Sequence, residues 1–400
     1  MKKLKKSKSK SKGKSNSRVI GWFALSFLAL GALLIYRLGS LTHGLSQQEI
    51  QTSTAAVGWH GIYHSPLDLP LKAIRSVVFY VFPSHGQTLT RLPNAVIGAL
   101  SIISFSWLAY LWHGRRTAIF ASVLFASSAW VLHVSRYASY DVVYLWAMTT
   151  LLLTHALLHH YKKQALVWYL TLLLWGLLLT IPGMIWFLLP SLYLQRTLIK
   201  NSLQTFGRWW QRVLAVIILL LWVPLLGVDL SRKGQLLAWL GLPNHLAGPA
   251  TLLKQFAGVF VHLFIRGPQY PTLWLGREPL LDAFTLAMCA LGIYFYGSRW
   301  RTGRSRLLVR TFVIGVILVA LQGPVSLSIL VPIVYAVAVM GIAYLTHEWL
   351  QVFPLNPLAR SLGIGLVAIV VSVSCIYNLR AYFIAWPHNT DTQTTFRYHL

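Results

Sequence analysis

Long apolar runs dominate this sequence and constrain its fold more than any other feature. An apolar helix of about 20 residues crosses the roughly 30 Å of hydrocarbon in a bilayer. Hydrophobic residues make up 56% of the chain and charged residues only 11%, whereas a soluble globular chain carries about 25% charged residues. The sequence therefore predicts an all-α membrane protein with about eleven transmembrane helices, at 19–36, 93–112, 117–134, 142–160, 165–180, 183–195, 212–228, 280–297, 307–322, 325–345 and 361–380.

The basic residues predict the orientation of these spans. The chain has 35 Lys and Arg against 8 Asp and Glu, and Lys and Arg are retained on the cytoplasmic side. They concentrate in the first 18 residues and in alternate connections, which include 113–116, 159–163 and 297–306. We therefore predict a multi-pass protein of the cytoplasmic membrane with its N-terminus inside and its C-terminus outside. The run at 19–36 is long for a signal peptide and lacks a small-residue cleavage site, which favours an uncleaved anchor.

This topology divides the chain into a basic cytoplasmic tail (1–18), a transmembrane domain (19–380) and an outer C-terminal tail (381–400). Two outer loops, 38–92 and 229–279, are too long to be turns. The first contains a moderately apolar stretch with Lys72 and Arg75, which predicts a helix lying in the membrane interface. The second contains an amphipathic or re-entrant segment at 252–264.

Several functional classes lack support in the sequence. There is no nucleotide-binding or hydrolase motif. The two cysteines, Cys289 and Cys375, lie in apolar runs, which supports neither a disulfide framework nor a thiolate zinc site. The basic tail lacks the interleaved aromatic residues of a nucleic-acid-binding segment, so we predict no nucleic-acid partner. No spacing requires a metal, although a divalent ion is compatible with the acidic residues.

The acidic residues indicate a functional site more specifically than the basic residues do, because seven of the eight fall in the predicted outer connections. Acidic residues contribute little to topology, so this segregation requires another cause, either helix capping or function. Chain order places a polar cluster on the outer face: Glu49, His64, Asp68, Arg91, Arg136 and Asp141. A carboxylate can take a proton from an acceptor hydroxyl, and cations can stabilise a departing lipid phosphate.

Four short motifs within this region resemble those of a known family. They are SQQE (46–49), HSPL (64–67), RLPNAVIG (91–98) and RYASYD (136–141). In this order they are similar to the GT-C membrane glycosyltransferases, in the branch of the protein O-mannosyltransferases and bacterial aminoarabinose transferases. The resemblance covers about residues 20–160, while the second half matches only in its general pattern of spans and loops.

The resemblance implies transfer of a sugar from a polyprenyl-phosphate donor to a hydroxyl of a protein, lipid or glycan, usually with inversion. The family's first-loop motif is commonly Asp-Glu, with the Asp as the base, whereas this chain has Gln48-Glu49. A glutamine cannot accept the proton. Glu49 would then act as the base, Asp141 would take over, or the chain would have lost activity.

The candidate site residues follow from this interpretation, and each also has a structural alternative. Glu49 and Asp141 are the candidate catalytic residues, although either could simply stabilise a helix N-terminus. The candidate arginines could instead reach out to lipid headgroups. The candidate substrate-binding residues are Arg136, Arg91, His64, Asp68, Lys72, Arg75 and Arg266, with Lys254, Arg277, Tyr270 and Trp274 as further candidates in the second loop.

A second class of function stays open: a non-catalytic protein that binds lipid-linked glycans, or a transporter or flippase. Transporters usually show internal repeats and polar groups near the middle of the bilayer. This sequence has no convincing repeat and gathers its ionisable residues at one face, which favours an enzyme. The missing aspartate beside Glu49 favours a binding role.

Overall fold

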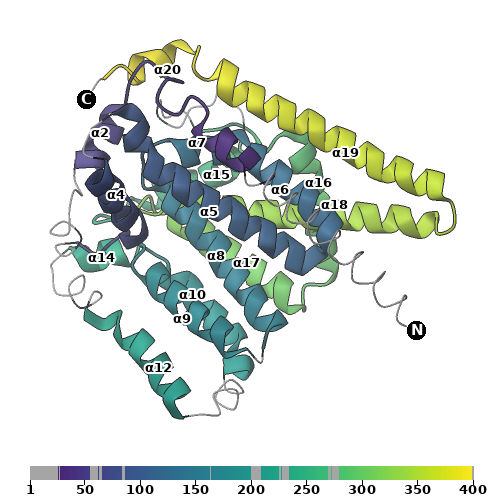
Figure 1. Ribbon diagram of the computed structural model, residues 1–400, viewed down its shortest axis with the longest axis horizontal. Helices are drawn as coiled ribbons and strands as arrows, with labels where there is room; N and C mark the ends of the chain where they lie inside the picture. The colour runs from purple at the N-terminus through teal and green to yellow at the C-terminus, as the bar shows by residue number, and fades with distance from the viewer. Residues whose placement is uncertain are drawn as a thin grey trace, which may run out of the picture.

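The protein is helical throughout the part of the chain that the computed structural model describes (Figure 1). That part comprises residues 26, 28–54, 62, 65–82, 86–162, 164–199, 209–224, 227, 234–268, 272 and 279–398. The fold class predicted from the sequence is therefore confirmed as all-α. The helices not introduced individually below are α9 (Ala165–Leu179), α10 (Ile185–Leu194), α12 (Trp209–Leu220), α14 (Gln235–Trp239) and α17 (Gly303–Ala320).

Four of the described helices are long and apolar enough to cross a membrane. They are α5 (Gln87–His113), α8 (Asp141–His160), α18 (Val331–Val352) with the 3-10 turn before it, and α19 (Pro357–Arg380) with the π turn after it. A fifth span results if the bent pair α6 and α7 counts as one. The protein is therefore a multi-pass membrane protein, and the total of eleven spans stays a prediction.

The helix α8 is the centre of the bundle. In its apolar window 94% of the residues are buried inside the protein, against 28% for α19. A helix that is hydrophobic on all sides is stable only where it is surrounded. The helix α5 packs beside α8, while α19 runs along the edge of the molecule (Figure 1).

The apolar run at 117–134, which we expected to form a single straight span, is broken into two helices. The helices α6 (Arg115–Ser127) and α7 (Ala129–Arg136) meet at Ser128 with a bend of 58°. The break leaves the first N–H of α7 without an intrahelical acceptor. Asn378 of α19 supplies one, because its Oδ1 accepts a hydrogen bond of 3.2 Å from the Ala129 N–H.

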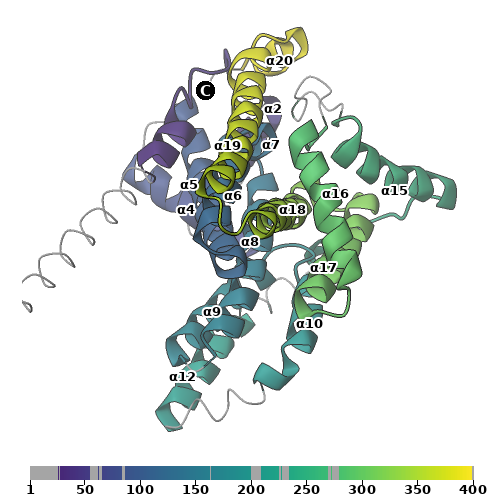
Figure 2. The same ribbon diagram turned by 90° about the vertical axis from the view of Figure 1, so that its right-hand side faces the viewer.

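Helices occur in both of the long loops that the sequence predicts to be outer loops, 38–92 and 229–279. In the first loop, α4 (Leu69–Val81) buries Leu71, Arg75 and Phe79, which recur every four residues and so share one face. In the second loop, α15 (Pro249–Phe264) covers the predicted amphipathic segment. The two helices lie on opposite sides of the molecule (Figure 2).

The C-terminal segment packs against the first outer loop. It consists of a π turn (Ala381–Ala385) and the short helix α20 (Thr390–Thr395), which lies near α2 (Gln47–Thr54) in Figure 1. Leu45 and Tyr398 form an antiparallel bridge with hydrogen bonds of 2.7 and 3.1 Å. Phe396, two residues earlier, is completely buried. This end of the bundle therefore contains both the first loop and the end of the chain.

The helices α16 (Ala283–Ser298) and α18 cross with their backbones in contact. A Cβ atom added at Gly292 would collide with the carbonyl oxygen of Val337, and one added at Gly341 would collide with that of Met288. Small residues at a helix crossing allow this close approach within a membrane.

We expect Gly292→Ala to destabilise the protein by about 1–3 kcal/mol, because the added methyl group pushes the two helices apart. Thermal unfolding in detergent measures the effect. Gly297→Ala on the same helix is the matched control, because its Cβ would meet open space. Equal unfolding temperatures for the two variants would contradict the close crossing.

Candidate functional site

The short helix α2 begins with a reciprocal pair of hydrogen bonds between Ser46 and Glu49. The Glu49 N–H donates to Ser46 Oγ at 3.1 Å, and the Ser46 N–H donates to Glu49 Oε2 at 3.0 Å. This is a capping box, in which two side chains satisfy backbone donors that a helix start otherwise leaves unpaired. The SQQE motif therefore has a local structural role.

Glu49 also forms a buried ion pair with Arg91 of α5. Arg91 Nε donates to Glu49 Oε1 at 2.8 Å, and Arg91 Nη2 donates to Glu49 Oε2 at 3.0 Å. The remaining Arg91 donors reach the carbonyl oxygens of Leu38 and Gly44, both at 3.1 Å, and Thr42 Oγ1 at 3.0 Å. Both charged side chains are almost inaccessible to solvent. The pair therefore joins the first outer loop to the start of a spanning helix.

The same carboxylate holds the connection between α7 and α8. Glu49 Oε1 accepts a hydrogen bond of 3.1 Å from the Ala138 N–H. On the other side of this connection, Asn94 Nδ2 donates to the carbonyl oxygens of Tyr137 at 2.7 Å and Ser139 at 2.6 Å. Residues 137–139 are therefore fixed between α2 and α5, directly before Asp141.

These contacts define what Glu49 can do in this conformation. Each of its carboxylate oxygens accepts two hydrogen bonds, from Ser46, Ala138 and the two nitrogens of Arg91. A general base must lie within hydrogen-bonding reach of the hydroxyl whose proton it takes. Glu49 is enclosed and its acceptor sites are occupied, so its geometry is that of a residue that positions its neighbours.

Asp141 has the more accessible carboxylate. It is half-buried at the first residue of α8, where a negative charge is favoured by the helix dipole. Its Oδ2 accepts one hydrogen bond of 2.8 Å from Ser139 Oγ, and no described lysine or arginine forms an ion pair with it. Asp141 therefore retains acceptor capacity for a further ligand.

A second group of candidates lies on α4, next to the connection that carries Asp141. Arg75 is completely buried, donates from Nη1 to the Thr52 carbonyl of α2, and lies 5.9 Å from the centre of the Tyr140 ring. Lys72 Nζ donates to the Ser65 carbonyl oxygen at 2.8 Å. Asp68 precedes the helix in a left-handed conformation, and its N–H donates to the Thr180 carbonyl at 2.8 Å. The structure brings Arg75 and Asp68 next to Tyr140, the residue directly before Asp141, while Lys72 lies between them on α4.

Arg75 is a buried cation that forms no ion pair with any described carboxylate. Its Nε and Nη2 atoms have no hydrogen-bond partner among the described residues. Burial lowers the pKa of the Arg75 guanidinium below its ordinary value, while Tyr140 and Asp68 oppose this effect. An unpaired buried charge is costly, so this position is suited to an anion that completes the hydrogen bonding.

The other candidate cations do not join this group. Arg136 donates to the backbone carbonyls of Leu33 and Tyr36, and its guanidinium lies 4.7 Å from the centre of the Phe383 ring. Lys254 and Arg266 are exposed on and after α15, and neither forms a hydrogen bond or ion pair with the α4 residues. The candidates His64, Tyr270, Trp274 and Arg277 lie outside the described residues.

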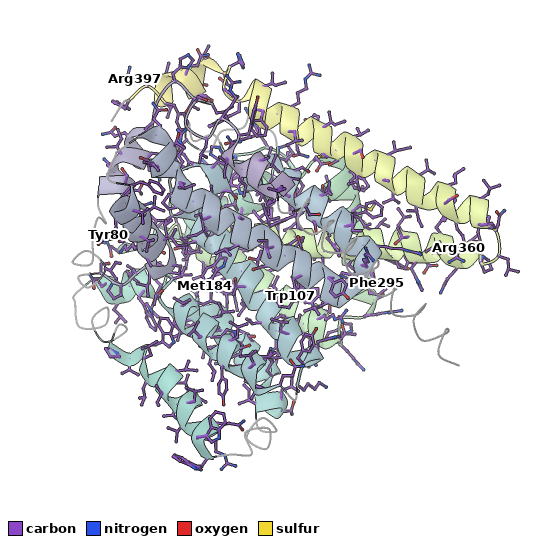
Figure 3. All side chains as sticks on the ribbon, in the orientation of Figure 1. Tyr80, Trp107, Met184, Phe295, Arg360 and Arg397 are labelled. Carbon is purple, nitrogen blue, oxygen red and sulfur yellow. The ribbon has the colours of Figure 1, made fainter. Side chains whose placement is uncertain are left out.

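An open pocket of about 650 Å³ lies on the opposite face of α2 from Glu49. Its described lining carries no charged side chain and is composed of amides and hydroxyls: Ser46, Gln47, Gln48, Gln51, Thr272, Thr394, Thr395 and Tyr398. Gln48 Oε1 accepts a hydrogen bond of 3.1 Å from Tyr137. Arg397, which lies in the same C-terminal segment, marks this end of the molecule in Figure 3.

Sequence reasoning missed several residues of this region. Asn94 and Tyr137 hold the connection before Asp141, and the C-terminal threonines complete the polar pocket. His133 is completely buried, and its Nε2 lies 2.7 Å from the Thr272 carbonyl oxygen. The spacing of Asn94, one helical turn after Arg91, was an available signal. The threonines had none, because they are remote in sequence.

No group of three or more His, Cys, Asp or Glu side chains suited to a metal ion occurs among the described residues. The described lining of the polar pocket likewise contributes only amide and hydroxyl groups.

Solved structures of two membrane enzymes share this fold. ArnT from Cupriavidus metallidurans bound to undecaprenyl phosphate matches with a TM-score of 0.56 and 12% identity, over 93% of this chain and 76% of ArnT. The Archaeoglobus fulgidus oligosaccharyltransferase tethered to an acceptor peptide matches with a TM-score of 0.51 and 13% identity, over 95% of this chain and 56% of that one. Its structure with Zn and sulfate matches with the same TM-score and 15% identity, over 92% of this chain and 53% of that one. The chain thus spans just over half of the archaeal protein.

No protein-family model matches the sequence, and neither does any curated protein. ArnT and the oligosaccharyltransferase are both GT-C glycosyltransferases. The fold expected from the first-half motifs is confirmed: the chain has a GT-C-like helical fold. At 12–15% identity this likeness establishes the architecture, and the chemistry must be argued from the residues.

We expect the Glu49–Arg91 pair to stabilise the protein strongly. Glu49→Gln or Arg91→Met alone should cost about 3–5 kcal/mol, because each leaves a buried charge without its partner. The double variant should cost much less than the sum of the two. Unfolding in detergent measures this double-mutant cycle, with the exposed Asp391→Asn as the control. Additive losses would show that the pair is not coupled.

Proposed function

We propose that the protein is a membrane glycosyltransferase that moves a sugar from a polyprenyl-phosphate donor to an acceptor hydroxyl. The reaction would take place at the end of the bundle that contains Glu49, on the outer face of the cytoplasmic membrane. The observation that carries this proposal is the buried guanidinium of Arg75, which pairs with no described carboxylate and lies 5.9 Å from the ring of Tyr140, the residue directly before the half-buried Asp141. Such a pair offers a binding group for the phosphate and a base for the acceptor.

Arg75 and Lys72 would hold the donor phosphate. Arginine forms two parallel hydrogen bonds with a phosphate group; Nε and Nη2 of Arg75 are buried without a hydrogen-bond acceptor among the described residues, so a phosphate would have to displace part of their cover to reach them. Lys72 follows Asp68 by one helical turn and lies one turn before Arg75 on the same helix. The undecaprenyl phosphate in the ArnT structure supports a ligand of this class.

Asp141 would activate the acceptor. Its carboxylate would take the proton of the acceptor hydroxyl as that oxygen attacks the anomeric carbon. The bond from the anomeric carbon to the phosphate oxygen breaks, and the electron pair leaves with the phosphate, which Arg75 stabilises. Glu49 would act as a positioning residue, since it holds the Ala138 N–H three residues before Asp141.

The polar pocket beside Gln48 would receive the acceptor. Its lining of amides and hydroxyls can exchange hydrogen bonds with a neutral polyol or with a peptide backbone. The absence of charged groups from the described lining favours an uncharged acceptor. The acceptor peptide bound to the archaeal structure supports an extended acceptor of this kind.

We expect Asp141→Asn to reduce transfer by about 10²–10⁴-fold, because the amide cannot accept the proton. The assay follows radiolabel from a polyprenyl-phosphate sugar into acceptors in membranes that contain the protein. Asp391→Asn removes an exposed carboxylate from the same end and should leave transfer unchanged. Full activity of the Asp141 variant would exclude its role as the base.

Arg75→Met should separate function from stability. Replacing an unpaired buried charge with an apolar side chain removes a desolvation cost, so the unfolding temperature should stay the same or rise. Binding of polyprenyl phosphate to the purified protein should fall at least about tenfold, because a charged hydrogen-bonding group is lost. A variant that loses stability but binds the carrier normally would show that Arg75 is structural.

A second candidate function is non-catalytic binding of a lipid-linked glycan. Gln48 favours it, because this residue faces the pocket with an amide where the resembled family commonly has a carboxylic acid. The same assay distinguishes the two functions. Carrier binding that depends on Arg75 without any transfer of label would establish the binding protein.

A further inference from the structure

A second pocket lies at the other end of the bundle. It has a volume of about 670 Å³ and is bordered by the last residue of α5, the start of α6, the C-terminal halves of α16 and α18, and α19. Along α5, 22 residues separate Arg91 from His113, which corresponds to about 33 Å of helix. Figure 3 shows Phe295, which lines this pocket, at the opposite end of the molecule from Arg397. The pocket is therefore distinct from the candidate site.

The polar part of this pocket is strongly basic. Arg115, Arg116 and Arg299 line it, together with His113 and His347, and Glu348 is the one carboxylate in the described lining. None of the three arginines forms an ion pair with any described carboxylate. The opposing arginines come from two separate elements, the start of α6 and the residue that follows α16.

The placement of Arg115 and Arg116 adds to this field. They are the first two residues of α6, whose first turn contains no acidic residue. A helix N-terminus carries a partial positive charge and unpaired N–H groups, so cations there are unfavourable unless an anion is present. Both side chains are exposed and can move to meet a ligand.

The remaining wall of the pocket is apolar. Phe295 and Tyr344 pack against each other with ring centres 5.6 Å apart, and Met340, Ala343 and Ile364 complete this wall. A free inorganic anion has no apolar part that could pack against such a surface. A lipid presents a phosphate and the first carbons of its acyl chains together, and basic pockets between membrane helices bind headgroups of this type.

We propose that this pocket binds a phosphate group, and that its ligand is the headgroup of an acidic phospholipid. Arg115, Arg116 and Arg299 contact the phosphate, while the Phe295–Tyr344 wall contacts the glycerol and the acyl chains. The bound lipid connects α6, α16 and α18 at the end of the bundle opposite the candidate active site. This inference does not depend on the proposed transferase activity.

The test measures lipid binding to the purified full-length protein in detergent by native mass spectrometry. Short-chain phosphatidylglycerol, phosphatidylcholine and inorganic phosphate are titrated separately. We expect phosphatidylglycerol to bind on the order of tenfold more tightly than phosphatidylcholine, because the net charge of its headgroup is negative. Arg115→Gln combined with Arg116→Gln should remove most of this preference.

Two further variants test whether the pocket residues themselves cause the binding. Arg301→Gln combined with Arg306→Gln removes the same charge from exposed positions outside the pocket lining and should leave binding unchanged. Glu348→Gln removes the one carboxylate and should strengthen binding. Equal losses from both arginine pairs, or no preference for phosphatidylglycerol, would overturn the proposal. Tight binding of inorganic phosphate that the lipid cannot match would retain the phosphate site and replace lipid by a soluble phosphate.

Discussion

The buried Glu49–Arg91 ion pair is the interaction on which one end of the helical bundle depends. Two charges removed from water are tolerated only when their remaining hydrogen-bonding groups are satisfied, and both side chains here meet that condition. Through Glu49 the helix α2 is joined both to α5 and to the connection before Asp141. The position of the connection before Asp141 follows in part from that arrangement.

The helix α2 separates two environments of different chemistry. On one side lies the neutral polar pocket, which Gln48 and Gln51 line together with the C-terminal segment. On the other side, the Thr52 carbonyl accepts a hydrogen bond from Arg75, and Thr52 Oγ1 donates to the Ala138 carbonyl at 2.7 Å. This division places an uncharged ligand surface and a cationic one within eight residues of chain.

The arginines at the two ends of the bundle differ in their burial and in their contacts. At the Glu49 end, Arg75, Arg91 and Arg136 are buried and engage a carboxylate or backbone carbonyls. At the other end, Arg115, Arg116 and Arg299 are exposed around a pocket with one carboxylate. The first arrangement fixes loops in a defined geometry, whereas the second leaves charges available for a ligand. The arginines of this chain therefore lie in two different structural environments, one at each end of the bundle.

Periodicity and composition determined the fold class and most of the helices, because an apolar run of membrane length has few alternatives to a helix. They also located α4 and α15, and they marked Glu49, Arg91 and Asp141 as neighbours at one face. The break at Ser128 could not be predicted, because the acceptor of the Ala129 N–H that it frees is Asn378, which is remote in sequence. The surroundings of the two carboxylates were likewise decided only by tertiary structure. Glu49 is buried and accepts four hydrogen bonds from three segments, while Asp141 is half-buried, and no local sequence pattern records how many donors will surround a carboxylate.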